Sequence, residues 1–258
     1  MVPEIKKDIK STQPPARAVS QPANPLPTRT YPLRVKFEKT GQLQYISHLD
    51  LNRTLSRGIV RAGVPVWYTE GFNPHPKLIF AAPLSVGIES VCEFCDIKTT
   101  EPPDCEKIKS ALLATMPEGL RIVDVYTQGD QPLAKFSTIA FSEYRIKIYT
   151  IGADEGLAAA CDKILRSPLK IIKRSKRGEG EIDLSSLIAR LEVRFDRLSG
   201  EICIETLLPA DSANYTNPEL LVGALSEHVG ILHGSVTEEY YSILRTQLYL
   251  HDKITPFK

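Results

Sequence analysis

The chain has 258 residues and is 42% hydrophobic, with 32 lysines and arginines against 31 aspartates and glutamates. That length suits one large domain or two small ones, and the near-zero net charge excludes a protein that is basic over its whole surface, such as a histone-like nucleic-acid binder. No apolar run approaches the ~20 residues of a membrane span, no secretory signal stands out, and five scattered cysteines suit a reducing compartment, so we expect a soluble cytoplasmic protein without membrane contact.

Residues 1–31 differ in composition from the rest of the chain. Seven of the 19 prolines fall within the first 32 residues, and residues 1–31 carry five basic side chains against two acidic ones. A segment with so few large apolar side chains cannot offset the entropy that is lost on ordering. We therefore expect a disordered, proline-rich, basic tail over residues 1–31.

Residues 32–128 show the succession of elements of one folding unit. Apolar and charged residues alternate from Leu33 to Phe37, which predicts a half-buried strand. Ser47 is placed to cap a helix whose apolar residues recur at helical spacing until Gly63. The order strand, helix, two strands, helix, strand is typical of a ferredoxin-like βαββαβ unit. The remaining strands and the second helix are expected at Leu78–Ala82, Ile88–Ile97, Asp104–Thr115 and Leu120–Tyr126.

The same order is predicted to recur over residues 139–252. The fold class that we predict is therefore α+β, with two tandem ferredoxin-like units, 32–128 and 139–252, after the disordered tail. One continuous α+β domain with a larger sheet is the alternative. Strands of the second unit are expected at Tyr144–Ile148, Leu169–Ile172, Leu191–Phe195, Ile202–Ile204 and about Val236–Leu250, with helices at Leu157–Leu165 and from Asn217–Glu219 onward.

Three arginines are expected on one face of the first helix. Arg53, Arg57 and Arg61 are spaced at i, i+4 and i+8. A guanidinium binds two phosphate oxygens at once, and three in a row repel one another unless an anion lies opposite. This arginine row is a candidate phosphate-binding surface. A solvated helix face, or a face paired with acids elsewhere, is the alternative.

The segment Gly71–Lys77 (GFNPHPK) is expected to form a stiff loop. Its two prolines fix φ, whereas glycine and asparagine accept left-handed backbone. Asn73, His75 and Lys77 are candidates for contact with RNA, with Lys77 at a phosphate and with His75 and Trp67 nearer the bases. A structural crossing loop is the alternative.

Five basic residues fall within eight positions between Lys170 and Arg177. A flexible basic loop adds salt-dependent affinity for phosphate, whereas a solvated hairpin tip is the alternative. Whether this run lies on the same face as the arginine row does not follow from the sequence. The candidate phosphate contacts in it are Lys173, Arg174, Lys176 and Arg177.

Other patterns are weaker. Cys92 and Cys95 form a CxxC without a second pair, in a predicted strand where positions i and i+3 point to opposite faces, so no metal site is expected. Ser47, His48 and Asp50 have the composition of a hydrolase triad, but neighbours in one helical turn cannot form its relay, and we expect a helix cap. The sequence has no P-loop, no GxGxxG and no CxxxCxxC iron–sulfur motif, and we expect no cofactor and no metal.

Three motifs, Tyr45–Leu51 (YISHLDL), Gly71–Lys77 and Pro83–Ser90 (PLSVGIES), resemble the radical-SAM-linked protein family, domain of unknown function 2344. A looser match extends to Ile243–Thr246 (ILRT). In that family the domain occurs alone or fused behind a B12-binding radical-SAM region, and this chain resembles the stand-alone form. The resemblance implies a radical-SAM protein as partner and assigns no biochemical role.

Paired ferredoxin-like units with a basic face are also similar to RNA-processing endonucleases of bacterial immunity, which cleave RNA without a metal and typically use a histidine. That resemblance implies His48 or His75 as general acid and base, although fold alone does not settle function. Our first hypothesis is an RNA-binding (tRNA or rRNA) accessory module of a radical-SAM modification system, without catalysis of its own. The alternatives are a metal-independent endoribonuclease and a structural module that holds a radical-SAM partner.

Overall fold

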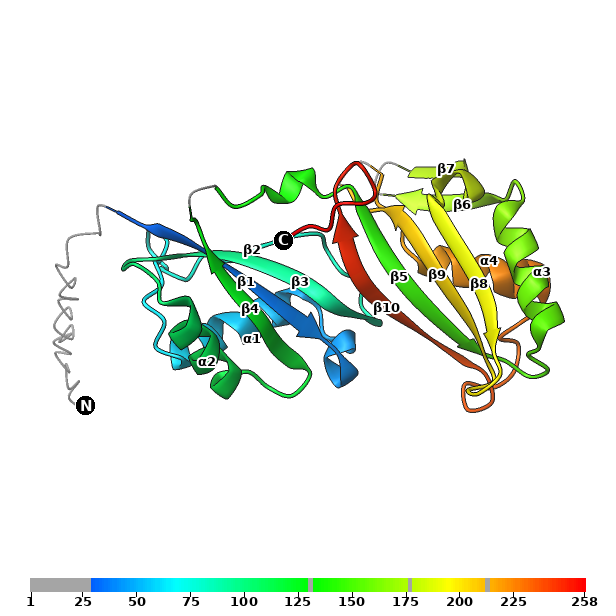
Figure 1. Ribbon diagram of the computed structural model, residues 1–258, viewed down its shortest axis with the longest axis horizontal. Helices are drawn as coiled ribbons and strands as arrows, with labels where there is room; N and C mark the ends of the chain where they lie inside the picture. The colour runs from blue at the N-terminus through cyan, green and yellow to red at the C-terminus, as the bar shows by residue number, and fades with distance from the viewer. Residues whose placement is uncertain (1–28, 130–131, 176–177, 212–213) are drawn as a thin grey trace, which may run out of the picture.

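The computed structural model describes residues 29–129, 132–175, 178–211 and 214–258 (Figure 1). Apart from positions 29–31, the expected tail lies outside the described residues. None of the helices in these ranges is long and apolar enough to cross a membrane.

The described ranges contain four α-helices and ten strands. The helices are α1 (His48–Arg61), α2 (Cys105–Thr115), α3 (Glu155–Arg166) and α4 (Glu219–Val229). The strands are β1 (Tyr31–Lys39), β2 (Ile79–Phe80), β3 (Ile88–Thr99), β4 (Leu120–Thr127), β5 (Phe141–Tyr149), β6 (Lys170–Ser175), β7 (Gly178–Asp183), β8 (Arg190–Asp196), β9 (Glu201–Pro209) and β10 (Tyr240–Tyr249).

Eight of these strands form one mixed sheet in the order β4-β1-β3-β10-β5-β9-β8, with β2 paired to β3 beside that path. Pairing is antiparallel within the first half (β1 to β4) and within the second half (β5, β8, β9 and β10). Strand β10 joins the halves because it also runs parallel to β3, with Ile243 opposite Ile88 and Arg245 opposite Ser90. The fold is thus α+β, as predicted, and its sheet is continuous across both halves.

Side-chain caps determine where the helices begin. Ser47 accepts a hydrogen bond from the amide of Asp50 (3.1 Å), and Asp104 accepts one from the amide of Lys107 (3.1 Å). Asp154 caps α3 in the same way. Each cap satisfies one of the amides that the first helical turn leaves without a partner. The predicted caps at Ser47 and Asp104 are confirmed.

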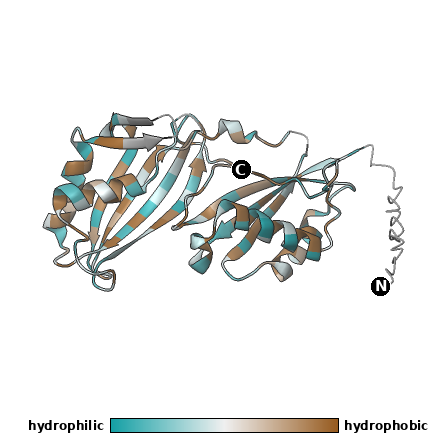
Figure 2. Ribbon diagram, turned by 180° about the vertical axis from the view of Figure 1, so that it is seen from behind, coloured by the Kyte–Doolittle hydropathy of each residue, from teal (hydrophilic) through white to brown (hydrophobic). Residues whose placement is uncertain are grey.

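Each half has its own apolar core. In the first half, alternate residues of β1 from Leu33 to Phe37 pack under α1 and α2. In the second half, Ile146 and Ile148 of β5 pack under α3 and α4, the two helices that lie in front of the strands at the left of Figure 2. A smaller cluster that includes Phe94 of β3 and Leu248 of β10 lies where the halves meet.

The other face of β1 is tied to two distant segments by Arg34, a residue that is only 1% exposed. Its guanidinium donates to both carboxylate oxygens of Asp96 (2.7 and 2.9 Å) and to the carbonyl of Ala134 (2.7 Å). The rings of Phe136 and Phe257 lie against the same guanidinium, 4.4 and 5.0 Å from its carbon. These contacts fix the linker between the halves on the first half.

The segment Leu169–Ile172 does not join the main sheet, contrary to its place in the predicted second unit. In the described part of the chain, β6 and β7 pair with each other alone. Ile171 packs on the second core, whereas Ile172 is exposed. The segment is a hairpin that lies on the core with one side, and a short apolar run in a sequence does not separate that case from a sheet strand.

Candidate nucleic-acid interface

The arginine row lies on the outer face of α1. Leu51, Leu55 and Ile59 are buried and fix the orientation of the helix, so Arg53, Arg57 and Arg61 point outward, as predicted, and are exposed. The periodicity of the apolar residues is sufficient to place the row on this face.

The arginine row is largely free of carboxylate partners. Arg53 makes one exposed contact with Asp50 at 3.4 Å, and Arg61 donates to the backbone carbonyl of Thr115 (2.9 Å). Within the described ranges, no carboxylate forms an ion pair with Arg57 or Arg61. An exposed pair of this length contributes little, so the alternative of a face neutralised by acids does not hold for the row as a whole.

The loop Gly71–Lys77 is closed by hydrogen bonds at its base. The amide of Thr69 donates to the carbonyl of His75 (2.9 Å), and the amide of His75 donates to the Thr69 hydroxyl (3.2 Å). The His75 Nδ1 lies 3.0 Å from the carbonyl oxygen of Asn73. The backbone of the loop is therefore defined, while the side chains of Phe72, Asn73, His75 and Lys77 are exposed.

The loop and α1 belong to the same structural unit. Val64 and Val66, which lead into the loop, and Leu78 and Phe80, which follow it, pack in the core that α1 covers. Trp67 is half-buried, and its ring lies 5.8 Å from the ammonium of Lys98. The structure thus brings the arginine row and the loop onto one half of the molecule.

The basic run of the second half does not join this surface. Lys173 and Arg174 belong to β6, whose hairpin packs on the second core, and Figure 1 shows it at the end of the molecule remote from α1. Lys176 and Arg177 lie outside the described residues. The predicted phosphate contacts are therefore divided between two separate places.

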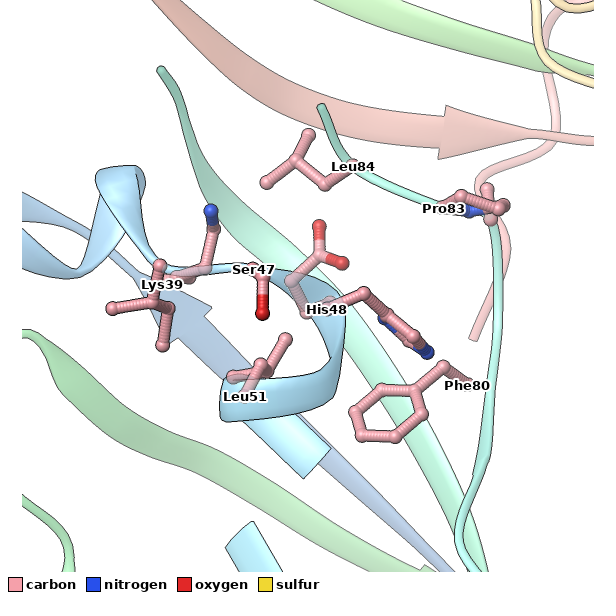
Figure 3. Close-up of a pocket in the computed structure, with 10 residues that line it drawn as sticks. Lys39, Ser47, His48, Leu51, Phe80, Pro83 and Leu84 are labelled. Atoms are coloured by element: carbon pink, nitrogen blue, oxygen red, sulfur yellow. The ribbon is translucent and has the colours of Figure 1, made fainter. Parts of the chain in front are cut away.

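His48 borders a small cavity under the first turn of α1 (Figure 3). Its ring meets Phe80 edge-on, with the ring centroids 4.7 Å apart. The Ser47 hydroxyl donates to the Asp50 carboxylate (2.7 Å) while it caps the helix, so these residues form a cap, as predicted. The cavity has a volume of about 10 Å³, which is close to the minimum for one water molecule.

Two buried charges line this cavity and a third, on Arg245, contacts residues of its wall; sequence reasoning missed all three. Arg245 is fully buried and donates to the Glu93 carboxylate, and also to the carbonyls of Ala82 (3.0 Å) and Pro83 (3.2 Å). Lys39 and Glu93 are 2% and 5% exposed and line the same cavity. Burial lowers the pKa of the Lys39 ammonium, and the Glu93 carboxylate offsets part of that effect.

A sequence signal for Lys39 was available. Leu33, Val35 and Phe37 are the buried positions of β1, and Lys39 is the next position on the same face. The alternation therefore predicts that the Lys39 side chain is buried. Glu93 and Arg245 are 152 positions apart, and their pairing depends on the contact between β3 and β10. No local pattern reports such a contact.

The CxxC residues lie in different cores. Cys92 packs with Phe94 and Phe257, and Cys95 packs with Leu33 and Val35. This separation confirms that positions i and i+3 of the strand point to opposite faces. Burial raises the pKa of the Cys92 thiol to about 12. In the described part of the chain, no group of three or more His, Cys, Asp or Glu residues is arranged to hold a metal ion.

Solved structures resemble the chain only weakly. A protein designated a glycine cleavage system transcriptional repressor is 12% identical with a TM-score of 0.22, over 86% of this chain and 99% of that chain. DyPB from Rhodococcus jostii RHA1 is 10% identical with a TM-score of 0.20, over 84% and 93%. An encapsulated DyP-type peroxidase from Mycobacterium smegmatis is 12% identical with a TM-score of 0.20, over 92% and 99%. Similarity of this size carries no information about function.

A search of curated proteins found no match. A family model, described as an uncharacterised protein conserved in bacteria (DUF2344), matches residues 32–218. This range includes α1 with its arginine row, the loop Gly71–Lys77 and most of the second half. Because the match spans well over half of the chain, the protein belongs to this bacterial family, domain of unknown function 2344.

Proposed function

We propose that the protein is an RNA-binding accessory module, for tRNA or rRNA, of a radical-SAM modification system in the cytoplasm. The observation that carries this proposal is the exposed arginine row, in which Arg57 and Arg61 form no ion pair with a carboxylate of the described residues. Residues four apart rise about 6 Å along a helix, so Arg53, Arg57 and Arg61 can follow successive phosphates of one strand. Lys77 and His75 present further donors from a defined loop on the same half.

The radical-SAM part of the proposal rests on the motifs that this chain shares with its family. The chain has no CxxxCxxC motif, and its CxxC thiols are buried apart from each other. A partner protein would therefore supply the iron–sulfur chemistry, and this chain would supply contact with the RNA.

We also propose that the two halves are tandem ferredoxin-like units. The first half has the strand order β4-β1-β3-β2 and the second has β10-β5-β9-β8. When the strands of each half that join the sheet are numbered in chain order, both arrangements become 4-1-3-2. The β6-β7 hairpin is then an insertion between the helix and the second strand of the second unit.

The test is filter binding of total cellular RNA at about 50 mM salt, where phosphate contacts are strongest. Replacing Arg53 and Arg57 together by glutamine should weaken binding about ten-fold or more, because two charge-assisted contacts are lost. Arg194→Gln, which removes an exposed arginine from β8, is the matched control and should bind like the wild type. Unmeasurable binding by the wild-type protein would contradict the RNA-binding proposal. The structural module that holds a radical-SAM partner would then remain as the alternative.

The endoribonuclease alternative is addressed in the same samples. The position of His48, beside a cavity with buried Lys39 and Glu93, favours it over His75 as the acid–base group. RNA cleavage in EDTA that disappears in His48→Ala would establish the enzyme. Binding without cleavage would exclude it.

A further inference from the structure

A second, larger cavity lies where the two halves meet. Its volume is about 410 Å³, within the ~300–1,000 Å³ that is usual for small-molecule sites. Its walls come from residues 81–83 after β2, residues 136, 137 and 139 in the linker, residues 210–211 after β9, and Tyr215 before α4. Such junctions between packed units are common ligand sites.

One wall is a fixed aromatic ring. Phe136 is half-buried, and it is supported by the Arg34 guanidinium at 4.4 Å and by the Phe257 ring at 5.8 Å. A ring held in this way stacks a flat ligand without losing conformational freedom of its own.

The wall formed by residues 81–83 is fixed by the buried ion pair. Arg245 donates to the carbonyls of Ala82 and Pro83, and both residues line the small cavity beside His48 as well as the larger one. Tyr215, on another wall, shares a hydrogen bond of 3.1 Å with the Ser85 hydroxyl. The cavity is therefore shaped by contacts that do not require a ligand.

Asp211 is the one ionisable carboxylate that lines this cavity among the described residues, and its lining includes no lysine, arginine or histidine. The backbone amide of Asn214 donates to Oδ1 of this carboxylate (2.9 Å), and the Asn214 side-chain amide donates to both of its oxygens (3.3 Å each), so the carboxylate is held in place. A carboxylate repels phosphate and attracts N–H donors, such as the exocyclic amino groups of cytosine, adenine and guanine. Apolar and aromatic walls with one carboxylate thus favour a base over the sugar–phosphate backbone.

We propose that this cavity binds one unstacked, amino-bearing nucleobase, with the phosphate outside. The inference rests on the proposed RNA binding and names the part of the RNA that the second cavity takes. Single-stranded RNA is read in this manner, by stacking on aromatic side chains and by hydrogen bonds to base edges.

The test compares cytidine and uridine monophosphates, with ribose 5-phosphate as the probe for the backbone, in NMR titrations of the full chain. We expect cytidine monophosphate to bind at least about ten-fold more tightly than uridine monophosphate, because only cytosine presents an amino group at position 4. Ribose 5-phosphate should not bind. Asp211→Asn should remove most of the difference between the two nucleotides.

Ser137→Trp closes the cavity from an exposed lining position, and Thr138→Trp, at the next exposed position outside the lining, is the matched control. Equal melting temperatures show that both variants fold. Loss of cytidine monophosphate binding in the first variant alone supports the inference. No nucleotide binding by the wild type, or unchanged binding by Ser137→Trp, would overturn the inference.

If the nucleotides do not bind but RNA is still retained on filters through Arg53 and Arg57, the proposed function stands while the base site fails. If the nucleotide binds but RNA is not retained, the base site stands and the proposed function fails.

Discussion

The Glu239 carboxylate holds the segment that leads into β10. It accepts hydrogen bonds from the Thr150 hydroxyl and from the amides of Gly234 and Ile151, the last at 3.0 Å. These bonds, that from Thr150 foremost, lower the pKa of Glu239 from 4.5 to about 2. The carboxylate therefore joins the start of β10 to the end of β5 more strongly when it is ionised than when it is protonated.

The resulting prediction concerns acid stability. The unfolded chain takes up this proton near pH 4.5 and the folded protein near pH 2, so the contribution of Glu239 is complete above pH 4.5 and is lost as the pH falls toward 2. Melting temperatures of wild type and Glu239→Gln should differ at pH 6 and approach each other by pH 2. Glu192→Gln, at an exposed position of β8, should follow the wild type throughout. A difference that stays constant with pH would contradict this role.

For single residues, the periodicity of the local sequence predicts well which side chains are exposed. It predicts poorly which residues pair over long distances in the sequence. The outward direction of Arg53 and Arg57 follows from the apolar residues of their own helix. The burial of Arg245 follows from a partner in another strand, which its neighbours in the sequence do not specify. The candidate surface could therefore be predicted, whereas the charged junction and the cavities beside it could not.

Among the elements, the contact that joins the two halves of the sheet, between β3 and β10, is short. It pairs three residues of each strand, from Ile88 to Ser90 and from Ile243 to Arg245. Arg245 crosses this contact to reach Glu93, and its remaining donors hold the segment after β2. A fully desolvated pair of this kind fixes the register of two strands more than it adds net stability.

A double-mutant cycle in urea tests this statement. Glu93→Leu leaves the Arg245 guanidinium buried without its carboxylate and should cost about 3–5 kcal/mol of unfolding free energy. The double replacement Glu93→Leu, Arg245→Met removes both charges and should cost clearly less than Glu93→Leu alone. Additive losses would show that the two residues act independently.

The helices could be predicted closely because their caps and apolar spacing are local signals. The observed α3 spans Glu155–Arg166 where Leu157–Leu165 was expected, and its Asp154 cap accounts for the earlier start. The strand predicted over Leu169–Ile172 belongs to the β6-β7 hairpin and not to the main sheet, a distinction that a short apolar run does not make. The parallel pairing of β3 with β10 joins segments about 150 residues apart and has no signature in either strand.

For the whole molecule, the net charge of +1 is an average over regions of opposite sign. The open face of the second half carries paired charges, such as Arg145 with Glu205 and Lys147 with Glu201. In the arginine row of the first half, only Arg53 forms an ion pair with a carboxylate among the residues that the structure describes. The RNA binding that we propose therefore depends on the charges of one half and not on the total charge.

The salt dependence of the proposed RNA binding measures how many phosphates the protein contacts. Three or four phosphate contacts from the arginine row and Lys77 should give a slope of log K against log salt of roughly −2 to −3 for single-stranded RNA. Arg57→Gln should reduce the magnitude of that slope by about 0.7. A slope near zero in filter binding between about 50 and 200 mM salt would show that phosphate contacts are not involved.

The place of β10 in the sheet has a consequence during synthesis. It is made after every other strand of the sheet, yet it lies between β3 and β5 near the middle. At ~5–20 residues per second, the ~140 residues that separate the end of β3 from β10 take roughly 7–28 s to translate. For that time β3 has an edge that only the two residues of β2 can cover, so the nascent chain exposes a strand edge that another chain could pair with and that β10 covers in the finished protein.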